Sequence, residues 1–440
     1  MSEPREQSAS ALLYQRALEI LPGGVSRNTV LRKPHPLYVD YGSGCRVTDI
    51  EGVERIDFAN NMASLIHGHA YPAVVAAVSE QLAKGTAFML ATEVEIRYAE
   101  HLLGRNPGFE KLRFVNSGTE AVMAGVKASR AYTGRAKIAK VEGAYHGLYD
   151  YAEVSQTSRP QNWGTVDSPS SNAVAYGTPP AALADVVVIP FNDPERALAI
   201  LQRHRGELAC VLLDVMPHRV GLIPADTEFV TALRDWTEAD GSLLVLDEVI
   251  TLRCEFGGAQ TWYDVTPDLT AMGKLIGGGF PVGAIAGRAS VMDVMNPLAD
   301  EVLFPHSGTF SANPITMTAG LAAMELFDEA AVAYVNALAK RAMDGIDEAI
   351  RSTGVKACTT GGGSMFRVHL KESPPSNYRE AFPTPAENRR LTVLLDHLFD
   401  EGLMMISTCS AALSTVMGES EIDLLISAMK SGFEKIAAAP

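Results

Sequence analysis

The sequence has few cysteines, and the ones it has are scattered. Its five cysteines form no Cys-x-x-Cys pair; they are Cys45, Cys210, Cys254, Cys358 and Cys409. An odd and dispersed set excludes a disulfide framework and is typical of reduced thiols that fill apolar cores. We therefore expect a cytoplasmic protein.

Positive charge is also scarce. The chain carries 37 Lys and Arg against 52 Asp and Glu, a net charge of −15. Because nucleic acids and anionic membrane surfaces are bound through basic patches, this balance argues against both partners. No uncharged apolar run is long enough to cross a bilayer. The polar start, residues 1–7, resembles neither a signal peptide nor a transit peptide.

Several common site motifs are missing as well. His67 and His69 are not part of a His-Glu-x-x-His zinc motif, and no cysteine lies nearby. We therefore interpret them as loop histidines near the pocket and predict no metal. There is no Gly-x-Ser-x-Gly elbow and no Walker lysine. Ester hydrolysis by such a serine and P-loop chemistry are therefore not indicated.

The pattern that is present predicts an α/β protein. Apolar segments at 112–115, 137–141, 186–189, 209–213 and 242–249 alternate with helical patterns such as 72–84 and 120–133. Strands that alternate with helices imply a parallel sheet covered on both faces. Short strands at 37–41, 46–50 and 55–58 predict a small antiparallel sheet, and the tail after 325 reads as α+β with a strand at 364–370.

A chain of 440 residues is long enough for a major and a minor domain. We predict an N-terminal segment, residues 1–70, that belongs to the small domain, a large domain at 71–325 and a C-terminal small domain at 326–440. The Ser-, Pro- and Gly-rich stretch 156–180 is either a functional lid or disordered.

The most informative residue is Lys274, which lies among glycines in the run 271–279. Upstream, the apolar run 242–249 predicts a buried strand that ends in Asp247 and Glu248. A lysine amine that forms a Schiff base and a carboxylate that pairs with a pyridinium nitrogen are what pyridoxal phosphate requires. Asp247 could also be a plain strand-end acid or a helix cap, but a carboxylate after so apolar a strand needs a cationic partner.

Other candidates gain weight only beside Lys274. Ser117, Gly118 and Thr119 precede a helix whose free N–H groups could bind an anion, although Ser and Thr also favour plain N-caps. Tyr145 follows a strand where an aromatic ring could stack on a ligand or simply pack in the core. Thr309 lies in a turn of hydroxyls and glycine, which by itself indicates little.

In order and spacing, these motifs resemble the class III aminotransferases of the type I pyridoxal-phosphate fold. The resemblance covers roughly residues 15–435 and rests on 117–120, 145–147, 247–249, 273–274 and 306–310. It implies a large domain with a mostly parallel seven-stranded sheet flanked by helices. It also implies a smaller α+β domain built from the N- and C-terminal segments.

The resemblance also implies roles for single residues. Lys274 would form the Schiff base and move the proton, and Asp247 would hold the pyridine nitrogen. Ser117, Gly118 and Thr119 would bind the phosphate. Tyr145 would stack on one face of the cofactor ring and Val249 would pack on the other, with His146 beside them. Thr309 would reach the phosphate of a neighbouring subunit. That last contact implies a homodimer with shared active sites.

Two subgroups of the family are the nearest matches. Residues 21–25 and the stretch 156–180 resemble glutamate-1-semialdehyde aminomutase. Residues 25–28 resemble the carboxylate-binding segment of β-amino-acid (β-phenylalanine) aminotransferases, which makes Arg27 the candidate substrate ligand, unless it is a surface cation. Arg219 is either a second carboxylate ligand or points outward, and no arginine follows Arg390 to clamp an acceptor carboxylate.

We therefore predict a pyridoxal-phosphate-dependent aminotransferase that works by a ping-pong mechanism. It would move an amino group from a carboxylate-bearing amine, for example a β-amino acid, to a keto acid or aldehyde. The alternative is an isomerase similar to glutamate-1-semialdehyde 2,1-aminomutase. A non-catalytic regulator on the same fold is disfavoured, because both Lys274 and Asp247 are present.

Overall fold

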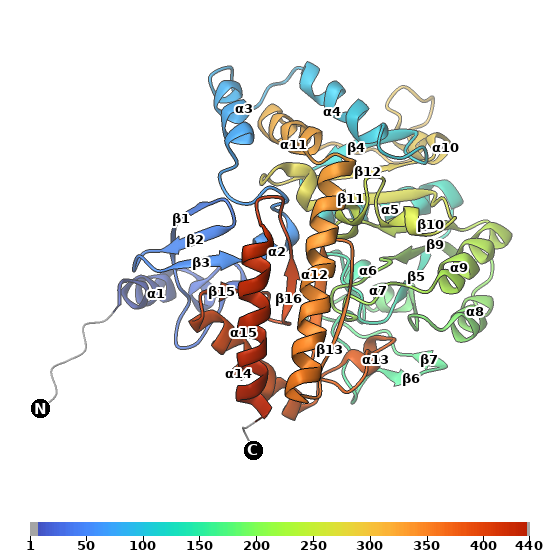
Figure 1. Cartoon of the computed structure of the whole chain (residues 1–440). Helices are drawn as coiled ribbons and strands as arrows, with labels where there is room; N and C mark the ends of the chain where they lie inside the picture. The colour runs from blue at the N-terminus through green and yellow to red at the C-terminus, as the bar shows by residue number, and fades with distance from the viewer. Residues whose placement is uncertain (1–7, 438–440) are drawn as a thin grey trace, which may run out of the picture.

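The computed structural model describes residues 8–437. Its centre is a seven-stranded sheet in the order β4-β12-β11-β10-β9-β5-β8 (Figure 1). The strands are β4 (Lys111–Val115), β5 (Lys137–Val141), β8 (Val186–Ile189), β9 (Leu208–Leu213), β10 (Leu243–Asp247), β11 (Leu269–Gly273) and β12 (Gly283–Gly287). Only β12 runs against its neighbours. The predicted seven-stranded, mostly parallel sheet is therefore confirmed.

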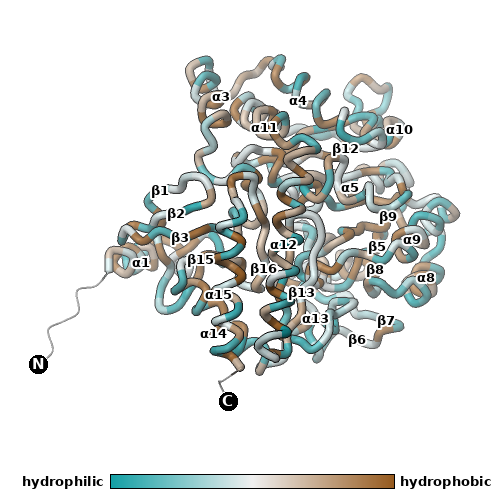
Figure 2. The backbone as a smooth tube through the Cα atoms, viewed as in Figure 1, coloured by the Kyte–Doolittle hydropathy of each residue, from teal (hydrophilic) through white to brown (hydrophobic). Residues whose placement is uncertain are grey.

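The central strands are apolar because both of their faces are covered. Every residue of β9 and β10 is buried. Along β10, Val245 packs with helix α5 (Gly118–Thr133), whereas Leu244 and Leu246 pack with α9 (Thr227–Asp240) on the other face. In Figure 2 the strands β8 and β9 are largely brown, and the helices α8 (Pro194–Gln202) and α9 are partly teal on their outer sides. Helices on both faces are what an interior parallel sheet needs.

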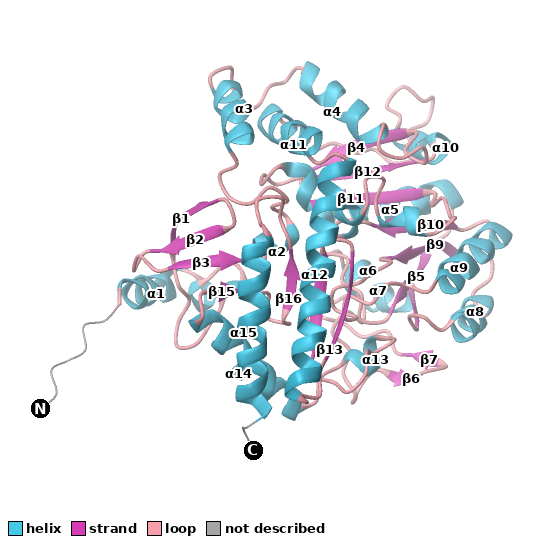
Figure 3. Ribbon diagram, viewed as in Figure 1, coloured by secondary structure: helices cyan, strands magenta, loops and turns pink. Residues whose placement is uncertain are grey.

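The two ends of the chain form a second structural unit. A four-stranded sheet joins β1 (Val39–Ser43), β2 (Arg46–Asp49) and β3 (Glu54–Asp57) to β15 (Leu403–Met404), which pairs with β3 in parallel. A three-stranded sheet joins β13 (Cys358–Gly362), β14 (Met365–His369) and β16 (Ser410–Ala412). Their common core includes α12 (Glu329–Thr353), α14 (Pro385–Asp400) and α15 (Glu419–Ala437), which lie in front of these sheets in Figure 3. This pairing supports a small domain made of both chain ends, with boundaries near 70 and 325 that stay a prediction.

The remaining elements are short connections and covering helices. The helices are α1 (Ala9–Ile20), α2 (Asn60–Ala63), α3 (Pro72–Leu82), α4 (Glu93–Leu103), α6 (Asp150–Glu153), α7 (Pro180–Ala184), α10 (Ala289–Met292), α11 (Pro314–Leu326) and α13 (Tyr378–Ala381). Six single turns of 3-10 helix are η1 (Pro22–Gly24), η2 (Asn28–Val30), η3 (Thr251–Cys254), η4 (Ala259–Trp262), η5 (Lys274–Gly277) and η6 (Asp293–Met295). Within residues 8–437 no helix has the length and apolar character needed to cross a membrane.

The stretch 156–180 is folded onto the large domain. It contains the small hairpin β6 (Gly164–Thr165) and β7 (Ser168–Pro169). The Ser155 hydroxyl donates to the Ser170 carbonyl at 2.7 Å, and Arg379 donates to three carbonyls of residues 163–165. These contacts argue against disorder of this stretch.

Candidate active site at the carboxyl edge of the large sheet

The sheet places Asp247 and Lys274 at the same edge. Strands β10 and β11 are parallel, and Asp247 pairs with Ala271, three residues before Lys274. The carboxyl ends of parallel neighbours share one edge of the sheet, which is where ligands bind in such folds. Lys274 directly follows β11 and has a positive φ of 49°. A lysine in this sparsely populated region is held there by its surroundings, as is common at functional sites.

Asp247 is fixed by two donors. Its Oδ1 accepts from the Val249 N–H at 3.0 Å and its Oδ2 accepts from His146 Nδ1 at 2.8 Å. His146 is buried, and burial lowers its pKa despite the attraction of Asp247, so we assign a neutral ring that donates from Nδ1. Its Nε2 has no hydrogen-bond partner within the described residues. This orientation leaves the carboxylate at a defined position, 4% exposed.

The environment of Lys274 favours a reactive amine. Burial lowers the pKa of Lys274, and the carboxylates of Asp247 and Asp214 partly oppose that shift. A lysine with a lowered pKa is more often the free amine, which is the nucleophilic form. Burial and the nearby Asp247 raise the pKa of Asp214, which lies at the end of β9 and accepts from the Met216 N–H at 2.9 Å. The Asp214 carboxyl group is therefore harder to ionise than an ordinary aspartate.

The start of α5 combines a cap with an anion site. The Ser117 side chain accepts from the Glu120 N–H at 3.1 Å, so Ser117 is the N-cap of α5. The first turn, with Gly118 and Thr119, still presents free N–H groups and the positive end of a 16-residue helix. A Cβ on Gly118 would lie 2.8 Å from Val249, so only glycine lets this turn approach the segment after Asp247. The anion site and the carboxylate are thereby neighbours.

The segment 145–147 rests on the same helix turn. A Cβ on Gly147, which has a φ of +92°, would lie 2.5 Å from Thr119 Oγ1, and this contact requires glycine. Tyr145 is 41% exposed rather than packed in the core, so the core-packing alternative is not supported. Its ring is therefore free to cover a ligand beside Thr119.

Lys140 anchors the backbone on both sides of the segment 145–147, and the sequence analysis did not identify it. The side chain is fully buried, and its Nζ donates to the carbonyls of Ala144 at 3.0 Å and Val154 at 2.7 Å. Burial lowers the pKa of Lys140 to about 7. Its only marker in the sequence is a charged residue inside the apolar strand 137–141. The position is consistent with a residue that fixes the path of the chain on both sides of Tyr145.

Thr309 lies in an exposed turn next to the anion site of its own chain. In that turn Ser311 Oγ is 3.4 Å from the Asn116 side chain, and Arg113 Nε donates to His306 Nδ1 at 3.1 Å. The expected contact of Thr309 with a neighbouring subunit concerns a second chain and stays a prediction.

Arg27 contacts an unusual turn rather than solvent alone. Its Nη1 donates to Asn61 Oδ1 at 2.8 Å. Asn61 belongs to α2, where four consecutive residues without glycine have positive φ, from 43° at Asn60 to 68° at Ala63. A left-handed turn of L-residues costs about 1–2 kcal/mol per residue. The surroundings must therefore stabilise it, and such strain clusters at ligand sites.

Three polar groups hold the left-handed turn. Asp57 Oδ1 accepts from the backbone N–H groups of Ala59 and Asn60, each at 2.9 Å. The Asn60 side chain donates to the Ala412 carbonyl at 2.7 Å. The third group is Arg253, which donates from Nη1 to the Ala63 carbonyl at 3.1 Å.

Arg253 links three distant parts of the chain. Besides Ala63, it contacts the Ser364 hydroxyl through Nε at 2.8 Å and the Leu413 carbonyl through Nη2. It is fully buried, and burial lowers its pKa to about 10. The sequence analysis did not assign it a role, because its partners lie far away along the chain.

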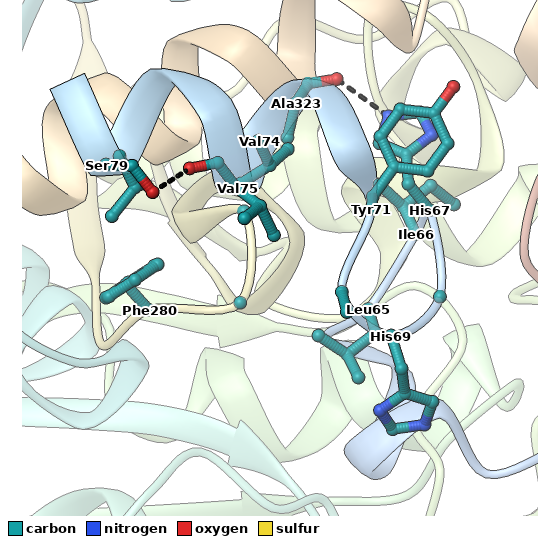
Figure 4. A pocket seen from close by; sticks show the side chains of 15 residues that line it. Leu65, Ile66, His67, His69, Tyr71, Val74, Val75, Ser79, Phe280 and Ala323 are labelled. Carbon is teal, nitrogen blue, oxygen red and sulfur yellow. Dashed lines mark hydrogen bonds between the residues drawn. The ribbon is translucent and has the colours of Figure 1, made fainter. Parts of the chain in front are cut away.

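A cavity in the described part of the chain lies next to the segment that follows Lys274, and Lys274 does not line it. It measures about 300 Å³ and is bounded by segment 65–79, by Gly278–Phe280 after η5, and by Ala323 (Figure 4). His67 Nε2 is hydrogen-bonded to the Ala323 carbonyl at 2.8 Å, and His69 Nε2 is 2.8 Å from Asp57 Oδ2. The two histidines are thus loop residues at a pocket, as expected. Because the ionisable groups converge at the sheet edge, we place the chemistry there and not in this cavity.

Comparisons with known proteins agree with this geometry. Residues 29–430 match the family Aminotransferase class-III. A glutamate-1-semialdehyde 2,1-aminomutase from Methanothermobacter thermautotrophicus is 37% identical over 370 residues, which is 84% of this chain and 85% of that protein. The crystal structure of an omega-transaminase from Sphaerobacter thermophilus has a TM-score of 0.96 and 44% identity and covers 99% of each chain. A β-phenylalanine aminotransferase from Variovorax paradoxus has a TM-score of 0.88 and 30% identity, covering 98% of this chain and 95% of that one.

Proposed function

The chain belongs to the class III aminotransferases, which are pyridoxal-phosphate-dependent enzymes, and on this premise we propose its reaction. It moves an amino group from a carboxylate-bearing amine, of the β-amino-acid class, to a keto acid or aldehyde by a ping-pong mechanism. The observation that carries the proposal is the adjacency of a partly buried lysine and a buried carboxylate at the ends of paired strands. The likeness to an omega-transaminase and a β-phenylalanine aminotransferase supports the substrate class.

The residues at the sheet edge fit pyridoxal phosphate. A Cβ at Gly118 or Gly147 would collide with Val249 or Thr119, so these glycines let the N-terminus of α5, Val249 and the segment 145–147 lie close together. When bound, the cofactor supplies an aldehyde that condenses with amines and a ring that withdraws electrons from the adjacent carbon. Lys274 would hold the aldehyde and Asp247 the pyridine nitrogen. The phosphate would lie at Ser117, Gly118 and Thr119, and the ring between Tyr145 and Val249.

The chain's own groups then divide the work. With the cofactor bound, the free amine of Lys274 would take the proton from the carbon that bears the donor amino group and return it to the carbon on the other side of that nitrogen, as a general acid–base. His146 keeps Asp247 oriented through the 2.8 Å hydrogen bond. The carboxylate of Asp247 would favour a proton on the ring nitrogen that it holds, because that pairing avoids an isolated buried charge.

Arg27 is the proposed ligand of the donor carboxylate. Its guanidinium is already oriented by Asn61, and no acidic side chain pairs with it within residues 8–437. A guanidinium bound to a neutral amide keeps its charge and donors available for a carboxylate. The left-handed turn would thus set the distance between the donor carboxylate and Lys274.

A homodimer completes the proposal. Phe88, Met89 and Leu90 are consecutive and exposed, with Met89 fully accessible, and Phe280 and Phe310 are further exposed apolar side chains. Contiguous exposed apolar side chains of this size are typical of interaction surfaces. We propose that a second copy covers them and that its Thr309 reaches the phosphate. The five cysteines are all free and buried, which supports the proposed cytoplasmic location.

The alternative function is that of a glutamate-1-semialdehyde 2,1-aminomutase, the activity of the 37% identical relative. In a mutase both half-reactions act on one substrate, so no external acceptor is consumed. The aminotransferase therefore requires an added keto acid or aldehyde as acceptor, and the mutase does not.

The test uses purified protein loaded with pyridoxal phosphate. We expect an absorbance band of the lysine-bound cofactor and, after borohydride, a fixed adduct on the peptide that contains Lys274. A screen of α-, β- and ω-amino donors is then run with and without a keto acid. Turnover that needs the keto acid supports the aminotransferase. Conversion of glutamate-1-semialdehyde without any acceptor establishes the alternative, and a colourless protein without an adduct refutes both.

A further inference from the structure

Within residues 8–437, a cluster of cations without a carboxylate partner lies beside Tyr145. It consists of Arg219 and Arg367 around His218, and Lys274 is close enough to contribute to the same field. The residues come from the segment after β9 and from strand β14 of the other structural unit. We call these residues the cation cluster.

The alternation of β14 directs Arg367 toward the site. Phe366 and Val368 pack in the core formed with α12, α14 and α15. On the other face, Met365 packs with Val215 and Met216, and His369 Nε2 lies 3.0 Å from the Gly221 carbonyl. Because side chains alternate along a strand, Arg367 shares the face of Met365 and His369. Its Nη1 donates to the His218 carbonyl at 3.4 Å, which confirms this direction.

Arg367 is a buried charge that its own chain leaves unsatisfied. It is 8% exposed, and its Nε is enclosed without a hydrogen-bond partner within residues 8–437. Burial lowers its pKa to about 10, and no carboxylate is among the groups that shift it. A buried guanidinium without an anion is unfavourable, and an incoming carboxylate would relieve it.

The other members of the cluster complete an anion site. The guanidinium of Arg219 is 5.2 Å from the centre of the Tyr145 ring, and the side chain is exposed, so it can move onto a ligand. Burial and the three nearby cations lower the pKa of His218 to about 3, so its ring is neutral and adds no charge. Its Nε2 is 3.1 Å from the Thr408 hydroxyl, which is 2.8 Å from the Ser410 hydroxyl. Guanidinium groups and hydroxyls are suitable donors for a carboxylate.

We propose that Arg219 and Arg367 form a second carboxylate subsite, separate from Arg27, that binds the carboxylate of the amino acceptor. The subsite rests on the proposed function, since it derives its purpose from the reaction at Lys274. No arginine follows Arg390 in the C-terminal segment to bind the acceptor carboxylate. Arg367 pairs across the sheet with Ser410 of that segment, so it can take the place of the missing arginine. The acceptor is accordingly a small keto acid or an aldehyde that carries a carboxylate.

The test measures carboxylate binding without turnover. Protein loaded with pyridoxal phosphate is titrated by calorimetry with glutarate and with the neutral glutaramide. We expect Arg219→Gln and Arg367→Met each to weaken glutarate binding at least about tenfold, and Arg367→Lys to weaken it less because it keeps the charge and loses the planar fork. Glutaramide binding should not change. Arg351→Gln, an exposed arginine of α12 paired with Glu348, is the matched control and should bind as the wild type does.

Two results would overturn the subsite. One is a glutarate affinity within twofold of wild type in both Arg219→Gln and Arg367→Lys. The other is complete loss of binding in Arg27→Ala alone, which would assign every carboxylate contact to Arg27. Arg219→Gln keeps the test decisive if Arg367→Met does not fold. The same titration on cofactor-free protein separates the two proposals, because failure of the cofactor to attach to Lys274 leaves this binding measurable.

Discussion

The two sides of the candidate site are built in different ways. On the cofactor side, Asp247 and Lys274 lie at strand ends of one sheet, and Ser117 caps the helix that follows β4. On the proposed substrate side, Arg27, Arg219 and Arg367 come from three segments far apart in the sequence, and each contacts a residue distant along the chain. One side is fixed by a single sheet and the other by long-range contacts.

Their charges differ in the same way. The cofactor side satisfies its own charge, because Asp247 has two donors and lies near the amine of Lys274. On the proposed substrate side the guanidinium groups of Arg219 and Arg367 contact backbone and aromatic groups and, among residues 8–437, no carboxylate. We infer that the first side is organised for one resident group, and the second keeps unsatisfied donors for ligands that come and go.

The largest effect is expected on the cofactor side. Lys274→Ala removes both the attachment point and the base, and general acid–base groups alone contribute about 10²–10⁴-fold. We expect turnover to fall to background and the absorbance of lysine-bound cofactor to disappear. Lys340→Ala, which removes an exposed lysine of α12, is the control. Activity that survives in Lys274→Ala would remove the lysine from its role and with it the division into two sides.

Asp247→Asn should have the next largest effect. The change keeps the shape and the Val249 contact but removes the negative charge that faces the ring nitrogen. Loss of a charged, buried hydrogen bond of about 1.5–3 kcal/mol predicts a fall in kcat of about 10–100-fold. Steady-state kinetics with saturating cofactor would measure it, with the exposed Asp344→Asn as the control. A rate near that of the wild type would argue against the pairing.

The same division explains how much could be predicted from the sequence. The strands β5, β8, β9 and β10 and the helix α5 follow from local patterns, and so does the position of Asp247 at a strand end. Strands β11 and β12 were not predicted, because the run Gly283–Gly287 contains only small residues and one isoleucine. Glycine is required in it, since a Cβ on Gly283 would collide with the Ser117 carbonyl.

The substrate side was less accessible to sequence reasoning. The left-handed turn 60–63 contains no glycine, so the local sequence does not predict it. It exists because Arg253 and the Asn60 side chain connect it to residues 412 and 413, about 350 positions away. Only folding makes such contacts visible. For that reason Arg27 could be proposed from its motif, but its orienting partner Asn61 could not.

Arg27→Ala tests the substrate side at its donor end. Because a charged hydrogen bond is worth about 1.5–3 kcal/mol, KM for carboxylate-bearing donors should rise about 10–100-fold. KM for simple amines and the absorbance of the bound cofactor should stay unchanged. Arg16→Ala, an exposed arginine of α1, controls for loss of charge near the N-terminus. An equal rise for carboxylate-bearing donors and simple amines would show that Arg27 does not contact the donor carboxylate.

The smallest effect concerns the turn that orients Arg27. Met62 has a φ of 58°, which glycine adopts without steric cost. Both Met62→Gly and Met62→Ala remove the side chain, but only glycine relieves the backbone. Met62→Gly should therefore be more stable to denaturant than Met62→Ala by about 1 kcal/mol, since the steric relief of about 1–2 kcal/mol exceeds the entropy that glycine loses.

The difference in stability between Met62→Gly and Met62→Ala measures the backbone strain of the left-handed turn alone, because both variants lack the methionine side chain. If Met62→Ala is the more stable variant in equilibrium unfolding, the turn is not strained, and Arg27 would need another explanation for its position. If Met62→Gly is more stable but has a higher KM for carboxylate-bearing donors, the rigid left-handed turn is maintained for binding at the expense of stability. On the cofactor side the comparable positive φ belongs to Lys274, whose side chain the reaction needs, so the same comparison of glycine with alanine is not available there.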